Sequence, residues 1–137
     1  MKIKYLPHTA DIRMFIEGET LQKLFKAGVK GMANILKENI CDHTHKFNSK
    51  TRIKTCSLDY TNLLIDFLSD VLTQTYTNKT IYCKINILSL ERHKIVADVF
   101  GIETHDFDEE IKAVTYHEAE VKKNKNNLWE TYIIFDI

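Results

Sequence analysis

The sequence predicts an α+β fold, a two-layer sandwich in which two amphipathic helices pack on a largely antiparallel or mixed sheet. Two observations lead to this prediction. Apolar residues recur at three- and four-residue steps in two segments, as on one face of a helix, and they alternate with polar residues in other segments, as in strands. A helix with one apolar stripe must bury it against another element, and a sheet face provides that partner.

The first half of the chain is expected to run from strand to helix to strand. Residues 12–17 alternate between apolar and polar side chains, which predicts a strand. Thr20 is a suitable N-cap for a helix that ends near Lys37. The polar segment 38–46 predicts a loop, and residues 47–58 return to a strand pattern. The apolar stripe of the helix consists of Leu21, Leu24, Phe25, Gly28, Met32, Ile35 and Leu36.

The second half is expected to hold one helix and then only strands. Asp59 is the candidate cap of the helix, and the apolar residues repeat on one helical face as far as Leu72. Short polar turns at residues 91–93 and 124–127 are typical of antiparallel hairpins. Four strands are predicted, over residues 80–90, 94–100, 110–122 and 128–137.

Length and composition are those of one globular domain, which we expect to span residues 1–137. The chain has only four glycines and one proline among 137 residues, which argues against a disordered or collagen-like protein. No apolar run approaches the ~18 residues of a membrane span, and the N-terminal residues do not form a secretory signal. We therefore expect a cytoplasmic protein without a membrane partner.

The charges of the chain balance, with 19 Lys and Arg against 19 Asp and Glu. Proteins that bind nucleic acid on their own usually carry excess positive charge, because phosphate neutralisation supplies most of the binding energy. The balance therefore disfavours autonomous binding to RNA or DNA. It leaves open a contact with RNA that is only indirect, through a protein that holds the RNA.

The three cysteines are Cys41, Cys56 and Cys83, which are far apart in the sequence and include no Cys-x-x-Cys pair. This usage predicts reduced thiols rather than a disulfide framework or a structural zinc site. Cys56 and Cys83 fall in predicted strands, where we expect buried thiols. The chain also lacks a Gly-rich phosphate loop, a G-x-S-x-G elbow and an H-E-x-x-H motif, so the enzyme classes that depend on them are disfavoured.

Carboxylates from the two ends of the chain form a candidate metal site. Asp11 ends the string H-T-A-D, and Asp136 stands next to the terminal carboxylate of Ile137. If the first and last predicted strands are neighbours, these three groups meet, and their repulsion requires a cation. Hard carboxylate oxygens favour Ca²⁺ or Mg²⁺, or else Mn²⁺, over zinc. The alternative is that both aspartates are strand-end acids that face solvent.

The histidines and the tryptophan allow simpler interpretations. His8 either takes part in that metal site, as a ligand or by orienting the neighbouring aspartate, or forms an ordinary hydrogen bond at a strand edge. His117 falls in the apolar register of its predicted strand, which indicates a structural role. His43 and His45 form an H-x-H pair without a clear third ligand, which argues against a zinc site. Trp129 is expected to anchor the core.

Several motifs resemble the archease family, and they occur in order along nearly the whole chain. The two strongest are H-T-A-D, which ends at Asp11, and K-A-V-T-Y-H, which covers residues 112–117. Weaker matches lie in the two predicted helices and at the C-terminal end. They are Thr20-Leu21 with Leu24-Phe25, Leu63-Leu64 with Phe67-Leu68, and Phe135-Asp136-Ile137.

Archeases are small cytosolic accessory proteins of the RNA ligase that joins a 2′,3′-cyclic phosphate or 3′-phosphate end to a 5′-hydroxyl, as in tRNA splicing and repair. The resemblance implies that the chain activates such a GTP-dependent ligase, promoting its guanylylation and multiple turnover, and is not itself an enzyme. It also implies a metal site, often described with calcium, at Asp11, Asp136 and Ile137. These are the carboxylates that the residues themselves indicate.

The segment from Gly101 to Glu110 departs from the family, because it looks shortened and lacks the usual Gly-Glu and longer connector. We therefore assign none of the family's functional residues to it. Its acidic residues and His105 predict either a solvated turn or a contact with a partner. The residues of this acidic loop are Glu103, His105, Asp106 and Asp108.

Two other functions stay open at this point. One is a metal-dependent hydrolase or nuclease built around the same carboxylates, although no general base or nucleophile pair is visible beyond scattered histidines. The other is a chaperone-like interaction module, in which the acids have only a structural role.

Overall fold

The protein combines two helices with two antiparallel sheets, which confirms the predicted α+β class. The computed structural model describes residues 1–6, 11–42 and 46–137. Within these ranges the chain forms eight strands, and they divide between a five-stranded and a three-stranded sheet instead of forming a single one. No helix in the described ranges has the length and apolarity needed to cross a membrane.

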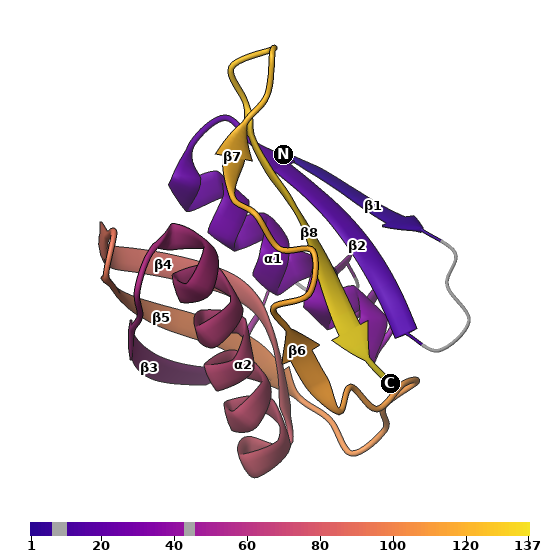
Figure 1. Ribbon diagram of the computed structural model, residues 1–137. Helices are drawn as coiled ribbons and strands as arrows, with labels where there is room; N and C mark the ends of the chain where they lie inside the picture. The colour runs from indigo at the N-terminus through magenta and orange to yellow at the C-terminus, as the bar shows by residue number, and fades with distance from the viewer. Residues whose placement is uncertain (7–10, 43–45) are drawn as a thin grey trace.

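Each sheet combines two consecutive strands with strands that are distant in the sequence (Figure 1). The larger sheet has the order β1 (Lys2–Leu6), β2 (Asp11–Gly18), β8 (Trp129–Asp136) and β6 (Ala113–Thr115), and β7 (Lys122–Lys123) also pairs with β8. The smaller sheet has the order β3 (Ser49–Cys56), β5 (Lys94–Glu103) and β4 (Thr80–Glu91). The helices are α1 (Leu21–Leu36) and α2 (Tyr60–Asn78), and a short 3₁₀ turn, η1 (Ile40–Asp42), follows α1.

Both predicted helix caps are confirmed. The Thr20 hydroxyl oxygen accepts a hydrogen bond from the main-chain N–H of Lys23 at 3.1 Å. The Asp59 carboxylate accepts one from the N–H of Asn62 at 2.8 Å. Each bond satisfies an N–H that a helix start leaves without an intrahelical partner. At the other end of α2, Lys79 adopts the left-handed conformation that commonly terminates a helix.

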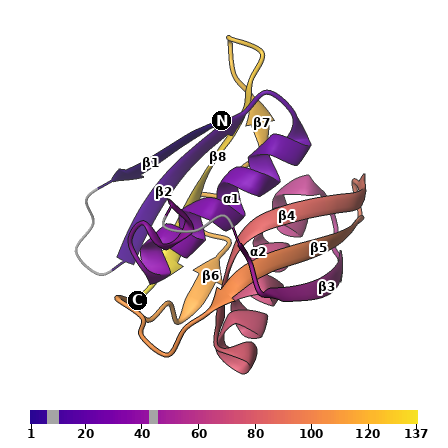
Figure 2. The same cartoon turned by 180° about the vertical axis from the view of Figure 1, so that it is seen from behind.

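Helix α1 packs between the larger sheet and α2 because two glycines let it approach both. A methyl group at Gly31 would lie 2.4 Å from the sulfur of Met14 on β2, and one at Gly28 would lie 3.3 Å from Leu68 on α2. Seen from the opposite side in Figure 2, α2 lies behind the three-stranded sheet. The helices and the inner sheet faces together enclose one apolar core.

Two parts of the chain differ from the predicted strands. Residues 2–6 form the edge strand β1, which the alternation did not indicate because all five of its residues are partly or fully exposed to solvent on an outer edge. The predicted strand 110–122 is wrong as a continuous element. It divides into β6 and β7 around a turn in which Glu118 has a φ of 61°. His117 lies exposed in this turn, so its predicted buried register is wrong as well.

The prediction that all three cysteines are reduced is also wrong, because Cys41 and Cys83 form a disulfide. The bond joins η1 to β4 across 42 residues of sequence. Sequence spacing could not indicate it, since the packing of α1 beside β4 is what brings the two Cα atoms to 5.5 Å. Cys56 is free, as predicted, but exposed rather than buried.

Candidate functional site

The first and last predicted strands are neighbours, which brings two of the three predicted metal ligands together. Strands β2 and β8 pair antiparallel, and their register places Asp11 opposite Asp136. On the other edge of β8, Ala113 stands opposite Asp136, and the N–H of Lys112 donates to the Asp136 carbonyl at 2.7 Å. Ile137 follows directly on β8, so the end of the chain is held against β6 as well as β2. Figure 1 shows the C-terminus at this end of the larger sheet.

Asp11 lines a cleft of about 530 Å³ whose wall carries three further carboxylates. Glu38 comes from the end of α1, and Asp108 and Glu109 come from the segment that follows β5. Three segments distant in the sequence therefore place acids around one opening. The remaining wall is formed by Tyr5, Leu6, Ile12, Asn34 and Ile35.

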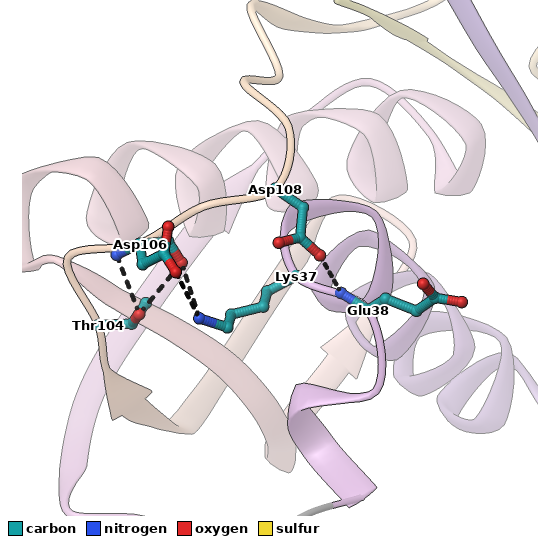
Figure 3. A network of polar contacts seen from close by, with 5 residues as sticks. All are labelled: Lys37, Glu38, Thr104, Asp106 and Asp108. Atoms are coloured by element: carbon teal, nitrogen blue, oxygen red, sulfur yellow. Dashed lines mark hydrogen bonds and ion pairs between the residues drawn. The ribbon is translucent and has the colours of Figure 1, made fainter.

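The segment after β5 is tied to the end of α1 by polar contacts, most of which Figure 3 shows from close by. The Asp108 N–H donates to the Leu36 carbonyl at 2.8 Å, and an Asp108 carboxylate oxygen accepts from the Glu38 N–H at 2.9 Å. The Lys37 ammonium donates to both the carbonyl and the carboxylate of Asp106, at 3.2 and 3.3 Å. These contacts satisfy groups that the helix terminus leaves open, and they place Asp108 beside Glu38.

Tyr5 forms a neutral part of the cleft wall. Its hydroxyl donates to the Gly31 carbonyl at 2.9 Å, and the Asn34 side-chain amide donates to the Tyr5 hydroxyl oxygen at 3.5 Å. Burial raises the pKa of Tyr5 above its ordinary value, and the contact with Asn34 opposes that shift. The hydroxyl therefore stays protonated at neutral pH and links β1 to the middle of α1.

Two cations near these acids are engaged by other groups. Arg13, two residues after Asp11 on β2, pairs with Glu118 at 3.2 Å and lies 4.1 Å from the centre of the Tyr132 ring. Lys37, next to Glu38, pairs with Asp106. These contacts hold both cations on partners that do not include Asp11 or Glu38.

The donor chemistry of the predicted metal set fits a hard divalent cation. Asp11, Asp136 and the main-chain end at Ile137 offer only oxygen atoms, which suit Ca²⁺, Mg²⁺ or Mn²⁺. Among the described residues, no three His, Cys, Asp or Glu side chains are grouped so as to hold an ion by themselves. A complete coordination shell therefore needs the main-chain oxygens of Ile137 and water in addition to the two aspartates.

The other predicted site residues fall in different places. His8, proposed as a supporting residue, lies outside the described residues, and so do His43 and His45. Asp108 of the acidic loop reaches the cleft, whereas Asp106 faces Lys37. Glu103 and His105 are exposed and do not line the cleft. Trp129 is partly buried and packs against the core, as predicted.

Sequence reasoning missed Glu38 and Glu109 as neighbours of Asp11. Glu38 stands in the polar segment after α1, and Glu109 stands in the segment that departs from the family. Neither position carries a local signal, because a solvent-exposed acid in a loop is the ordinary case. Only the pairing of this segment with the end of α1 distinguishes them.

The chain matches one protein family over almost its whole length. The model of the archease protein family (MTH1598/TM1083) matches residues 4–137. The protein archease of Methanosarcina acetivorans is 31% identical over 146 aligned positions, which cover 99% of this chain and 96% of that protein. The protein archease of Thermococcus kodakarensis is 26% identical and is covered to 99%, as is this chain.

Solved structures agree with the fold. The solution structure of protein 1598 from Methanobacterium thermoautotrophicum matches with a TM-score of 0.78 at 22% identity, and 98% of each chain is covered. The crystal structure of a Thermotoga maritima protein, described as an archease and possible chaperone, matches with a TM-score of 0.68 at 18% identity over 100% of this chain and 98% of that one. Sequence and fold together place this chain in the archease family.

Proposed function

We propose that the chain is a cytoplasmic accessory protein that activates a GTP-dependent tRNA-splicing RNA ligase and is not catalytic alone. It promotes guanylylation and multiple turnover of the ligase, which is its protein partner, and it meets the substrate RNA in the company of that ligase. The single observation that supports this proposal is the register pair of Asp11 and Asp136 beside the acid-lined cleft, in a chain of the archease family.

Asp11, Asp136 and the main-chain oxygens of Ile137 are the groups that would hold a divalent cation, with Ca²⁺ first and Mg²⁺ or Mn²⁺ as alternatives. When bound, such a cation offsets negative charge on nucleotide phosphates during guanylyl transfer. The chain's own contribution is positional. Three strands, β2, β8 and β6, hold these oxygens at one sheet end, and the contacts of Lys37 and Asp108 keep the cleft wall next to them in place.

The role of the carboxylates is tested with Asp11→Asn and Asp136→Asn. These variants keep side-chain volume and remove the charge. We expect each to lower stimulation of ligase–GMP formation by tenfold or more, on the order of the loss when a positioned charge is removed from a phosphoryl-transfer site. The readout is the radiolabelled GMP adduct of the ligase after incubation with GTP. Glu120→Gln is the control. It removes an exposed carboxylate between β6 and β7 that does not line the cleft.

Metal binding is measured separately, by calcium-dependent thermal shift and calorimetry on the isolated protein. Both aspartate variants should lose the shift, and addition of residues after Ile137 should weaken it. Full stimulation by both aspartate variants would refute the proposed role of these carboxylates. RNA cleavage by the isolated wild-type protein, lost in the same variants, would identify a metal-dependent nuclease instead.

A further inference from the structure

The three-stranded sheet presents its outer face to solvent. Helices α1 and α2 pack on the inner face of this sheet, α1 against β4 and α2 against all three strands, and α2 lies behind the strands in Figure 2. The inner face carries the buried residues Ile53, Ala97 and Ile85. On the outer face the side chains of Lys50 and Arg52 are 58% and 61% exposed. The outer surface of these strands is therefore open to a partner.

The strand register arranges this face in rows. Lys50 on β3 and Lys84 on β4 both stand opposite Phe100 on β5, so one row reads lysine, phenylalanine, lysine. The two ammonium groups lie 5.9 and 5.7 Å from the centre of the Phe100 ring. Lys54 stands opposite Val96 two rows along. Cations thus flank a half-buried aromatic ring on both sides.

The middle row is organised by Asp98. Its carboxylate is buried under Arg52, which donates to it through two nitrogens at 2.9 and 3.1 Å, and Lys50 lies 3.7 Å away. The pair holds the guanidinium against the Asp98 carboxylate, since two hydrogen bonds leave it little freedom. One carboxylate therefore holds two of the four cations, and the three rows keep an excess of positive charge. We name this surface the basic face; it comprises Lys50, Arg52, Lys54, Lys84, Asp98 and Phe100.

We propose that the basic face binds single-stranded RNA, with its lysines on the phosphates and the Phe100 ring against a base. A flat sheet that combines an aromatic ring with flanking Lys and Arg side chains is a recurrent platform for single strands. The charge is complementary to a polyanion, and the aromatic ring at its centre favours a nucleic acid over an acidic peptide, because every base offers a π-face. The chain is neutral as a whole, so this affinity arises only from the local segregation of charge.

This contact extends the proposed function without depending on it. In Figure 2 the C-terminus, where the candidate metal site lies, and β3 are at opposite sides of the molecule. An activator with this arrangement can present its acidic end to a ligase while the basic face meets the RNA. Neither ligase nor metal is needed to detect the contact.

The test is fluorescence polarisation of a labelled single-stranded RNA of mixed sequence, at about 20 mM and about 100 mM salt. The triple variant Lys50→Gln, Lys54→Gln, Lys84→Gln leaves the Arg52–Asp98 pair intact. We expect it to bind RNA at least about tenfold more weakly at low salt and to lower the slope of log affinity against log salt by about 2, because each phosphate contact on a single strand contributes about 0.7.

The matched control is Lys26→Gln, Lys122→Gln, Lys125→Gln, which removes the same charge from exposed positions elsewhere. It should keep the wild-type affinity within about twofold. Phe100→Leu should weaken binding about fivefold and leave the salt slope unchanged, because it removes stacking and no charge. Circular dichroism and thermal unfolding confirm that each variant is folded.

Three outcomes would overturn the proposal. One is an equal loss of affinity in the two triple variants, which would indicate net charge alone. Another is the absence of saturable RNA binding by the folded wild-type protein at low salt. The third is tighter binding of an acidic peptide than of RNA with the same number of charges, which would make the face a protein-docking surface.

Discussion

The acid-lined cleft and the basic face carry opposite charge and are built in different ways. The cleft takes its acids from β2, the end of α1 and the segment after β5, which meet only in the folded chain. The basic face takes three of its cations from alternate positions of one strand, β3. The net charge of zero therefore describes neither region, because the electrostatic potential at each one is set by the charges nearby.

A covalent link connects the two regions. Cys41 belongs to η1, five residues after the end of α1, and shares a hollow with Tyr5 and Asn34 of the cleft wall. Cys83 is the neighbour of Lys84 on β4. The disulfide lies at the place where the register of β4 shifts against β5. The two regions thus differ in charge but are linked through one disulfide.

The largest effect is expected when the charges of one region are removed and the binding property of each region is measured. Asp11→Asn with Asp136→Asn should abolish the calcium-dependent thermal shift and leave RNA affinity within about twofold. The triple variant Lys50→Gln, Lys54→Gln, Lys84→Gln should weaken RNA binding and leave the calcium-dependent thermal shift unchanged. Thermal shift and fluorescence polarisation on the same preparations measure both. Loss of both properties in either variant would show that the regions are not independent.

The second test removes the link. Cys41→Ser with Cys83→Ser should lower the free energy of unfolding by about 4 kcal/mol, because a closed loop of this length restricts the unfolded chain. Urea unfolding without reductant measures the difference, which should vanish when dithiothreitol is present. Cys56→Ser, at the free and exposed cysteine, is the control and should have little effect. Equal stability of parent and double variant without reductant would contradict the expectation.

The third test concerns the scaffold of the basic face. A methyl group at Gly101 would lie 2.3 Å from the carbonyl oxygen of Ile81, a main-chain atom that cannot rotate away. Gly101→Ala should therefore destabilise the fold by about 2 kcal/mol in urea unfolding. In Gly28→Ala the new methyl meets the flexible end of Leu68, and the gain in helix propensity offsets the contact, so its effect should be smaller. A smaller effect at Gly101 than at Gly28 would refute this account.

The smallest effect is a pH dependence of the stability that comes from Asp98 on the basic face. The hydrogen bonds from Arg52 hold the pKa of Asp98 below its ordinary value, against the opposing effect of burial. A carboxylate with a lowered pKa stabilises the folded state above its unfolded pKa, about 4, and loses this contribution as the pH falls through the folded pKa. Asp98→Asn should therefore be less stable than wild type at pH 7, and the difference should shrink below about pH 4.

Urea unfolding from neutral to acidic pH measures this convergence. Glu120→Gln removes an exposed carboxylate and provides the comparison. A difference between Asp98→Asn and wild type that stays constant down to low pH would show that packing, and not charge, explains the effect.

Local patterns predicted most elements, and the failures have a common origin. Thr20 and Asp59 mark the helix starts because capping is a property of a few adjacent residues. The convergence of Asp11 with Asp136 was predicted on the condition that the end strands pair, and they do. The strand predicted over 110–122 is wrong because the chain turns at Glu118, which has a left-handed backbone conformation. No residue type in this segment indicates such a conformation.

By itself the sequence determined the α+β class, the helix caps and the motifs of the archease family, because each depends on residues a few positions apart. Only the tertiary structure decided the division into two sheets, the Cys41–Cys83 bond and the placement of Glu38 and Glu109 beside Asp11. These depend on contacts between segments tens of residues apart. Such contacts are selected by the packing of the whole core, which no local pattern contains.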